Sequence, residues 1–312
     1  MKPVIYIDGK EGTTGLQIYE RLGKRDDIEL LLIDEDKRKD TKERAKFINK
    51  ADIVFLCLPD AASREAVTLV ENPNTRIIDA STAHRTNPDW DYGFAELSIE
   101  RRRAISSSKR VANPGCHATG FISIVYPLVH LGILPKDYPM SFFSLTGYSG
   151  GGKKMIAGYE SENKPQEFYA PRIYSLGLNH KHLPEMKKVC SIDNPPVFTP
   201  VVDDYYKGMA GTLSLVNSRL NGKYTAQQIQ NALSKYYEGQ KLVKVSEFGG
   251  NTDMLSANKM AGKDSLEIVV CGNDEQTIIT ALFDNLGKGA SGAAVQNMNI
   301  MLGFDETTGL NI

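Results

Sequence analysis

Short apolar runs alternate with helical patterns through the first third of the chain. The apolar runs predict strands, and the segments between them place apolar side chains three and four residues apart, as in a helix that faces a core. The predicted strands and helices are, in order, 4–7, 16–22, 29–33, 41–50, 52–58, 61–70 and 76–79. Strands that alternate with helices over short connections pair in parallel, so this part predicts a doubly wound, Rossmann-type sheet.

After residue 116 the pattern changes, because strand-like runs follow one another with few helices between them. The predicted strands are 141–145, 196–202, 212–216, 241–245, 266–270 and 276–283, and the clearest helix is 226–237. This pattern predicts mixed or antiparallel pairing. The chain ends with a stretch that is first glycine-rich and then apolar, 287–303, which we expect to form a helix that returns to the first sheet.

The predicted fold class is therefore α/β, with a Rossmann domain at 1–115 plus 285–312. Residues 116–284 are predicted to form an inserted α+β domain for catalysis and oligomerisation. A chain of 312 residues is long enough for two such domains with large cores.

The charge balance and the apolar runs exclude two classes of partner. The 37 Lys and Arg residues nearly balance the 38 Asp and Glu residues, so a general basic surface for nucleic acid is not expected. No apolar run approaches the length of a membrane span, and no basic segment followed by a long apolar one begins the chain. We expect a cytoplasmic protein that binds neither nucleic acid nor membrane.

Cysteine spacing predicts neither a metal site nor a disulfide framework, since Cys57, Cys116, Cys190 and Cys271 form no C-x-x-C pair and no Cys/His metal motif. Cys57 and Cys271 fall in strand-like runs, where a thiol serves as packing. Cys116 follows Asn-Pro-Gly and begins a predicted helix. The free N–H groups and the dipole of a first turn favour a thiolate, so Cys116 is the candidate nucleophile. The alternative is a small apolar residue at a helix junction.

A glycine turn between the first strand and the first helix predicts dinucleotide binding. A helix N-terminus at this position can hold a pyrophosphate through backbone N–H groups. The spacing is G-x-x-G-x-x-G rather than the commoner G-x-G-x-x-G, and a tight turn that needs positive φ is the alternative. The expected cofactor-binding residues in this turn are Gly9, Gly12, Thr13, Thr14 and Gly15.

The charged segment after the second strand favours NADP over NAD. A lone acidic residue there is typical of NAD, because it binds the ribose 2′-hydroxyl. Here three acidic residues are followed by Lys37, Arg38 and Lys39. These cations can neutralise a 2′-phosphate, and an arginine can do so with two hydrogen bonds. We expect Lys37 and Arg38 to bind NADP; the alternative is a solvated loop of mixed charge.

Two histidines and a carboxylate, His180, His182 and Glu185, lie within six residues. A cysteine nucleophile needs a base or a cationic partner, and histidine is the usual one near neutral pH. His-x-His can also bind a metal, but a suitable third ligand is not evident. The other three histidines, His117 among them, have no comparable group of titratable residues near them in the sequence.

A glycine-rich run, Gly147–Lys154, nearly matches a P-loop, but Lys154 replaces the Ser or Thr that binds Mg²⁺. The run could still hold a phosphate or the nicotinamide end of a cofactor. The alternative is a flexible loop.

Four motifs, in this order along nearly the whole chain, resemble the N-acetyl-γ-glutamyl-phosphate reductases in their shorter form. They are Asp79–Arg85 (DASTAHR), Asn113–Cys116 (NPGC), His180–Glu185 (HKHLPE) and Asp284–Ala290 (DNLGKGA). The wider group includes aspartate-semialdehyde dehydrogenases and glyceraldehyde-phosphate-type enzymes. The resemblance implies that NADPH reduces an acyl phosphate to an aldehyde, in arginine biosynthesis.

The same resemblance implies roles for the residues of these motifs. Cys116 resembles the acyl-accepting nucleophile, and His180 resembles its acid/base. His182 and Glu185 would orient the substrate or that histidine. Arg85 is our hypothesis for a cation that meets an acid group of the substrate.

The cofactor would lie close to Ser149 and Gly150, with Gln296 and Asn297 near its carboxamide end. Since the family usually associates, we expect a homo-oligomer, either a dimer or a tetramer, that acts on a small-molecule substrate. Three alternatives stay open: an aspartate-semialdehyde dehydrogenase, an NTPase built on the glycine-rich run, and a non-enzymatic NADP sensor with a redox-active Cys116.

Overall fold

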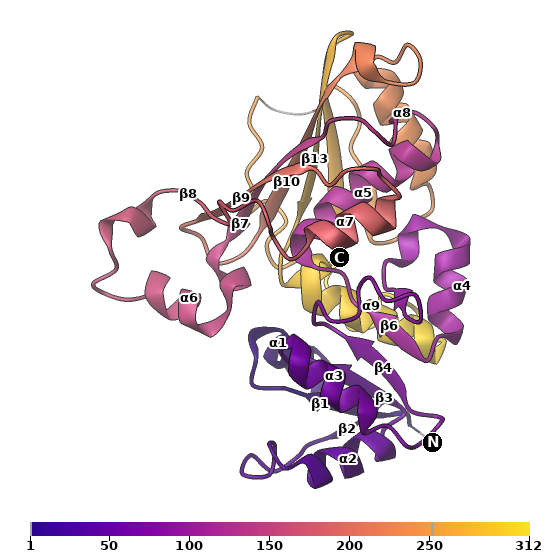
Figure 1. Ribbon diagram of the computed structural model, residues 1–312, viewed down its shortest axis with the longest axis vertical. Coiled ribbons are helices and arrows are strands. Elements are labelled where there is room, and N and C mark those ends of the chain that lie inside the picture. The colour runs from indigo at the N-terminus through magenta and orange to yellow at the C-terminus, as the bar shows by residue number, and fades with distance from the viewer. Residues whose placement is uncertain (1, 251–252) are drawn as a thin grey trace. The chain divides into compact units, whose positions relative to one another are not determined.

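The computed structural model describes residues 2–250 and 253–312 (Figure 1). Contacts divide the chain into two compact units: unit 1 is Met1–Gly115 with Ala290–Leu310, and unit 2 is Cys116–Gly289 with Asn311–Ile312. The predicted boundaries lie at 115/116 and 284/285. Over the described ranges, no helix combines the length and the apolar character needed to cross a membrane.

Unit 1 contains a six-stranded sheet of order β2-β1-β3-β4-β6-β5, in which every pairing is parallel. This confirms the predicted doubly wound sheet. Its elements are β1 (Val4–Asp8), α1 (Thr13–Leu22), β2 (Glu29–Leu31), α2 (Thr41–Lys50), β3 (Ile53–Leu56), α3 (Asp60–Thr68), β4 (Arg76–Asp79), β5 (Asp91–Tyr92), a 3₁₀ turn (Ala95–Leu97), α4 (Ile99–Ser107), β6 (Arg110–Ala112) and α9 (Gly292–Leu302).

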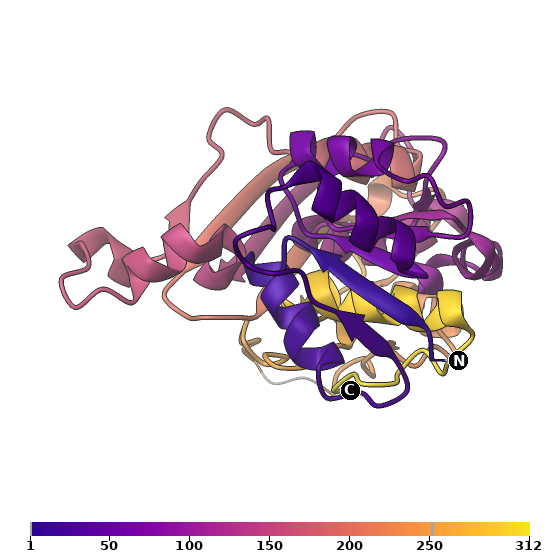
Figure 2. The same cartoon turned by 90° about the horizontal axis from the view of Figure 1, so that it is seen from below.

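Both faces of this sheet are covered, because successive side chains of a strand point to opposite sides. Ile5 and Phe55 pack into one apolar cluster with side chains from α1 and α9. Tyr6 and Val54 pack into a second cluster with side chains from α2 and α3. Figure 2 shows α9, in yellow, beside the indigo strands of unit 1, as predicted for a helix that returns to the first sheet.

Unit 2 contains a seven-stranded mixed sheet of order β11-β12-β13-β10-β7-β9-β8. The predicted mixed pairing is confirmed, since β7 and β9 are parallel whereas β10 is antiparallel to both β7 and β13. The elements are α5 (Cys116–His130), β7 (Ser141–Gly147), a 3₁₀ turn (Tyr148–Gly151), α6 (Gly152–Tyr159), a 3₁₀ turn (Gln166–Tyr169), β8 (Arg172–Ile173), α7 (Leu183–Cys190), β9 (Val197–Asp203), β10 (Met209–Val216), a 3₁₀ turn (Asn217–Arg219), α8 (Ala226–Tyr236), β11 (Val243–Val245), β12 (Leu266–Gly272) and β13 (Gln276–Phe283). A π-helical turn, Gly287–Ser291, leads into α9.

Helices α5 and α8 contact the sheet of unit 2, and α7 packs against α5 (Figure 1). The side chains of β7 alternate accordingly, since Phe142 and Ser144 are buried whereas Ser141 and Phe143 are exposed. The face opposite these helices presents large apolar side chains to solvent. They are Phe143, Val197, Val216 and Ile278, each at least two-fifths exposed.

Helices α4, α6 and α7 are absent from the sequence-based prediction, and for α4 and α7 the physical reason is plain. Helix α4 is polar almost throughout and buries a single side chain, Ile105, so its sequence carries no apolar stripe. Helix α7 contains Pro184, but in its first turn, where the missing N–H group has no partner to lose. Tertiary packing, rather than a sequence pattern, supports both helices.

Candidate functional site

The candidate nucleophile lies at the start of a buried helix. Strand β6 ends at Ala112, and α5 begins at Cys116, as predicted. The residues of α5 that follow, from His117 to Val125, are all buried, whereas Cys116 itself is partly exposed. The thiol therefore lies where first-turn N–H groups and the helix dipole act on it, with access from solvent.

His117, the next residue, has polar partners that its neighbours in the sequence do not indicate. The prediction that this histidine lacks such partners is therefore wrong. Its ring is 2% exposed. Its Nδ1 lies 2.9 Å from Ser144 Oγ, and its Nε2 lies 2.6 Å from the Tyr174 hydroxyl. Burial, with smaller effects of the charges on His180 and Lys181, lowers the pKa of His117 to about 3. His117 is therefore a neutral ring at physiological pH.

His180 is part of the same aromatic cluster. Its ring centroid lies 5.4 Å from that of His117, 4.7 Å from that of His182 and 5.1 Å from that of Phe198 on β9. The backbone N–H of His182 donates a 3.1 Å hydrogen bond to His180 Nδ1. Because Nδ1 accepts this bond, the neutral His180 ring carries its proton on Nε2.

Tyr174 connects the cluster to the nucleophile. Its hydroxyl contacts His117, and its ring centroid lies 6.0 Å from that of His180. Burial raises the pKa of Tyr174, and the negative charge of a Cys116 thiolate raises it further. Unit 2 therefore gathers Cys116, His117, Tyr174 and His180 in one place.

His182 and Glu185 lie behind His180 rather than at the surface. His182 is the N-cap residue of α7 and is 5% exposed; Glu185, in the first turn of that helix, is 1% exposed. A carboxylate in a first turn interacts favourably with the helix dipole. Both buried side chains therefore lie in the segment that directly follows His180.

The glycine-rich run of unit 2 is held by a residue of the last motif. Asn285 Nδ2 donates to Ser149 Oγ over 2.9 Å, and Asn285 Oδ1 accepts from the backbone N–H of Gly208 over 2.9 Å. A Cβ atom at Gly150 would lie 3.4 Å from Asn285 Nδ2. Asn285 therefore fixes the turn at Ser149 and Gly150, whereas Lys153 and Lys154 are exposed on α6.

In the glycine turn of unit 1, backbone packing requires glycine at two of the three glycine positions. Gly9 has φ of +88°, and a Cβ atom there would lie 2.4 Å from the carbonyl oxygen of Cys57. A Cβ atom at Gly15 would lie 2.4 Å from the carbonyl oxygen of Gly9. Gly12 differs, since a Cβ atom there would make only ordinary contacts. Gly12 is also the N-cap of α1. Because glycine has no side chain, the first turn of α1, which begins with Thr13 and Thr14, receives no side-chain capping bond from it.

A pocket of about 520 Å³ opens beside this turn. It is bounded by Gly9 and Gly12, by the end of β2, and by Arg38 and Lys39. The ammonium of Lys37 pairs instead with Asp34 at 3.1 Å, outside the pocket lining. Cys57 also borders the pocket, where burial raises the pKa of its thiol, as suits a packing role.

The lining of this pocket includes an ion pair that the sequence alone does not predict. Arg44 on α2 reaches the Asp8 carboxylate at the end of β1, with Nη2 2.9 Å from Oδ2, and both side chains are less than one-tenth exposed. Glu65 lies 3.6 Å from the same guanidinium. The pair joins α2 to the end of β1, directly before the glycine turn.

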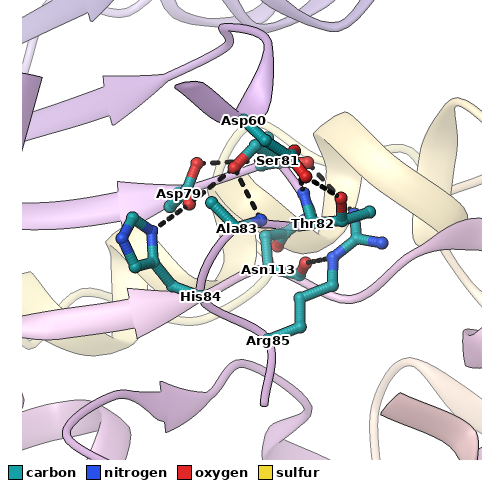
Figure 3. A network of polar contacts seen from close by, with 9 residues as sticks. Asp60, Asp79, Ser81, Thr82, Ala83, His84, Arg85 and Asn113 are labelled. Carbon is teal, nitrogen blue, oxygen red and sulfur yellow. Dashed lines mark hydrogen bonds and ion pairs between the residues drawn. The ribbon is translucent and has the colours of Figure 1, made fainter. Parts of the chain in front are cut away.

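Arg85 belongs to a polar network at the end of β4 (Figure 3). The buried Asp79 carboxylate accepts from the Ser81 N–H and hydroxyl, and it lies 2.6 Å from His84 Nδ1. Arg85 Nε donates to the carbonyl oxygen of Asn113 over 2.9 Å, and Nη2 donates to that of Ala80 over 3.1 Å. Part of the guanidinium thus holds the backbone three residues before Cys116.

The two amides expected near the cofactor lie on α9, and both are 1% exposed. Gln296 Nε2 donates to Glu96 and to Glu306, each over 2.8 Å. Asn297 Nδ2 donates to the carbonyl oxygen of Gly93 over 2.9 Å. Asn297 Oδ1 is buried, and within residues 2–250 and 253–312 it accepts no hydrogen bond.

The structure adds four residues to those singled out in the sequence: Arg44, His117, Tyr174 and Asn285. Two of them carried a usable signal, because His117 follows Cys116 and Asn285 lies in the last motif. Tyr174 and Arg44 carried none. In the part of the chain that the structure describes, no three His, Cys, Asp or Glu side chains are grouped so as to hold a metal ion.

Comparison with known proteins identifies the family. A protein from Brucella ovis named N-acetyl-gamma-glutamyl-phosphate reductase is 48% identical, over 97% of this chain and all of that protein. A protein from Nostoc sp. PCC 7120 named N-acetyl-gamma-glutamyl-phosphate reductase 2 is 45% identical over 99% of both chains. This chain belongs to the N-acetyl-γ-glutamyl-phosphate reductase family. The resemblance drawn from the four motifs is confirmed.

The two halves of this reductase family chain match separate domain families. Residues 32–105 match the family described as semialdehyde dehydrogenase, NAD binding domain, and residues 116–285 match semialdehyde dehydrogenase, dimerisation domain. The chain is thus an oxidoreductase of amino-acid biosynthesis with a domain for a nicotinamide cofactor.

Solved structures of related enzymes share the fold. Aspartate semialdehyde dehydrogenase II from Vibrio cholerae superimposes with a TM-score of 0.74 at 16% identity, over 97% of this chain and 98% of that one. The Francisella tularensis enzyme has a TM-score of 0.74 at 14% identity, over 97% and 100%. The predicted α/β fold class is confirmed.

Proposed function

We propose that this chain reduces N-acetyl-γ-glutamyl phosphate to N-acetylglutamate γ-semialdehyde and phosphate, with NADPH, through a thioester on Cys116. The observation that carries the proposal is the position of Cys116, at the start of α5 beside the cluster of His117, Tyr174 and His180. Relatives at 45–48% identity named for this reaction support the same substrate.

Cys116 attacks the acyl carbon as a thiolate, so that the C–S bond of a thioester forms while the C–O bond to phosphate breaks. The chemistry that a nicotinamide cofactor would supply when bound is a hydride for the thioester carbon. The alkoxide then re-forms the carbonyl group as the C–S bond breaks, which releases the aldehyde and regenerates the Cys116 thiolate. Backbone N–H groups at the start of α5 stabilise the oxyanion.

One proton is taken up in each turnover and ends on the released phosphate, and we assign its delivery, as the C–O bond to phosphate breaks, to His180. The neutral ring carries its proton on Nε2, since Nδ1 accepts from the His182 N–H. His182 and Glu185, both buried, position this ring. Arg85 is assigned the acid group of the substrate, as a cation whose guanidinium is oriented by hydrogen bonds to the carbonyl oxygens of Asn113 and Ala80.

The cofactor assigned to unit 1 is NADP. Gly12 supports a pyrophosphate at the first turn of α1, because the chain's own packing does not explain its missing side chain. Arg38 and Lys39 border the pocket where the 2′-phosphate would lie, so Lys39 replaces Lys37 in the assignment.

The carboxamide end of the cofactor is assigned to Asn297. Its buried Oδ1 matches an amide N–H donor, and the described residues supply none. Gln296 is placed behind it, where its bonds to Glu96 and Glu306 fix α9. In unit 2, Ser149 and Gly150 are assigned to the nicotinamide side, on a turn fixed by Asn285.

A homo-oligomer built on unit 2 completes the proposal. The segment that matches a dimerisation domain spans this unit, and its sheet has one face with exposed Phe143, Val197, Val216 and Ile278. Burying such a patch against a second copy of the chain removes apolar surface from water.

The test is the reverse reaction, in which NADP⁺ is reduced in the presence of phosphate and N-acetylglutamate γ-semialdehyde. We expect turnover with this aldehyde, slower turnover with aspartate semialdehyde, and a preference for NADP⁺ over NAD⁺. Replacing Cys116 by serine (C116S) should abolish steady-state turnover while NADPH binding, measured by fluorescence, stays near that of the wild type. Normal turnover by C116S would contradict the proposal. Faster turnover of aspartate semialdehyde than of N-acetylglutamate γ-semialdehyde would change the assigned substrate.

A further inference from the structure

Three hydrogen-bonded polar side chains form a line through His117, the residue next to the nucleophile, and the proposed reaction leaves this line unused. Ser144 on β7 is 0% exposed, and its Oγ lies 2.9 Å from His117 Nδ1. His117 Nε2 lies 2.6 Å from the hydroxyl of Tyr174, which follows β8. The line therefore runs from the core of unit 2, through the residue next to Cys116, to a tyrosine hydroxyl.

The neutral charge of His117 restricts how this line can be protonated. A neutral imidazole has one N–H donor and one acceptor nitrogen. In the first arrangement, Tyr174 donates to Nε2, and Nδ1–H donates to Ser144. In the second, Ser144 donates to Nδ1, Nε2–H donates to the Tyr174 oxygen, and the Tyr174 hydroxyl proton is left for another acceptor.

The charge at residue 116 favours the second arrangement. Tyr174 lies within electrostatic reach of a Cys116 thiolate. In the first arrangement the Tyr174 oxygen would turn its lone pairs toward that negative charge. In the second, all three donors point toward the charge, and hydrogen bonds aligned in this way strengthen one another.

We infer that the Tyr174 hydroxyl, aligned by His117, is a hydrogen-bond donor to the negative charge at Cys116, both on the sulfur before attack and on the acyl oxygen afterwards. The proton stays on Tyr174 throughout. Tyr174 is therefore a catalytic residue and His117 a positioning residue that acts through it. This inference rests on the proposed function for its second half only, because the thiolate exists without a substrate.

Replacing Tyr174 by phenylalanine removes the donor and keeps the ring. We expect kcat to fall by about 100-fold, as for the loss of one oxyanion donor, with little change in NADPH binding. The matched control is Tyr126→Phe, which removes the hydroxyl of another partly buried tyrosine, stacked on His130 at the other end of α5. This control should keep wild-type kcat.

Substitutions of His117 separate alignment from general packing. His117→Leu should lose nearly as much of kcat as Tyr174→Phe, and the double variant should be no slower than Tyr174→Phe alone. His117→Gln offers the Tyr174 hydroxyl a polar partner again and should recover part of the rate. Independent, multiplying effects of the two sites would overturn the inference, as would a kcat within about twofold of wild type for Tyr174→Phe.

Alkylation of Cys116 tests the free enzyme without any substrate. The rate of modification by iodoacetamide follows the thiolate fraction, so its pH profile reports the pKa of Cys116. Loss of a donor to the thiolate should move the Tyr174→Phe profile to higher pH, and an unmoved profile would contradict the inference. If the wild type does not act on N-acetylglutamate γ-semialdehyde, the proposed function fails, while this profile still decides whether Tyr174 donates to Cys116.

Discussion

His117 follows Cys116 directly, but the surroundings of its ring set its chemistry. An exposed histidine at this position would titrate near neutral pH and could serve as the base for the thiol. The buried ring, between Ser144 and Tyr174, stays neutral and instead orders its neighbours. Residue type alone therefore gives the wrong role, and the contacts give a different one.

The neutral state of His117 predicts a loss of stability in mild acid. The unfolded residue takes up a proton near pH 6.5, whereas the folded one does so only near pH 3. Between these values the unfolded state binds more protons, so the free energy of unfolding falls as the pH falls. The contribution is fully present above pH 6.5, and about 2 kcal/mol of it should be lost between pH 7 and pH 5.

Urea unfolding at pH 7 and pH 5, for the wild type and for His117→Gln, measures this effect. The variant should lose less stability than the wild type over the same interval, since glutamine does not titrate. Equal losses in the two proteins would contradict a buried, neutral His117.

Gly9 and Gly12 belong to one turn but should respond differently to an added methyl group. Gly9→Ala places Cβ against the Cys57 carbonyl at a positive φ and should cost about 1–3 kcal/mol of stability. Gly12→Ala has room within the chain, so its stability should stay within about 0.5 kcal/mol of wild type. Its dissociation constant for NADPH should rise, because the methyl group lies where the pyrophosphate would approach. A Gly12→Ala variant with wild-type affinity would argue against this site for the cofactor.

At the scale of elements, buried charges join strands to the helices beside them. Asp8 and Arg44 join β1 to α2, and the Asp79 carboxylate orders the segment from Ser81 to His84 after β4. Patterns of apolar residues predict β1, α2 and β4 well. The same patterns do not reveal which charged residue of one element meets which residue of another, because such pairs depend on the packing angle.

Removing one partner of the Asp8–Arg44 pair should destabilise unit 1. Asp8→Ala leaves Arg44 buried, and breaking a buried pair typically costs about 3–5 kcal/mol. Glu65 at 3.6 Å remains a partial partner, so about 3 kcal/mol is expected. Chemical denaturation checks this value, with Asp34→Ala, at an exposed pair, as the control that should leave stability nearly unchanged. A similar small change for Asp8→Ala would show that the buried pair is not needed.

At the scale of the whole molecule, the two units differ in how their sheets are covered. The sheet of unit 1 has apolar clusters on both faces. The sheet of unit 2 is packed against helices on one face, and the register of β7, β10 and β13 sets Phe143 and Ile278 on the other. A half-covered sheet with exposed large apolar residues is typical of a subunit interface.

A charge placed on that face should dissociate the oligomer. Phe143→Glu would bury a carboxylate against a second copy, so we expect a lower mass by sedimentation or light scattering, with the fold retained by circular dichroism. The control is Leu131→Glu, since Leu131 is 44% exposed but lies after α5, away from this face. An unchanged mass for Phe143→Glu would place the interface elsewhere.

Neighbouring residues alone predicted most strands and helices, the parallel and mixed sheets, the family and the motifs that carry Cys116 and His180. They could do so because strand and helix periods, glycine turns and short motifs are written in neighbouring residues. Tertiary packing was needed to show that Ser144, His117 and Tyr174 form one line, that Lys39 rather than Lys37 borders the pocket, and that Arg44 pairs with Asp8. Those contacts join residues far apart in the chain or turn on the direction of one side chain, and three-dimensional packing alone fixes both.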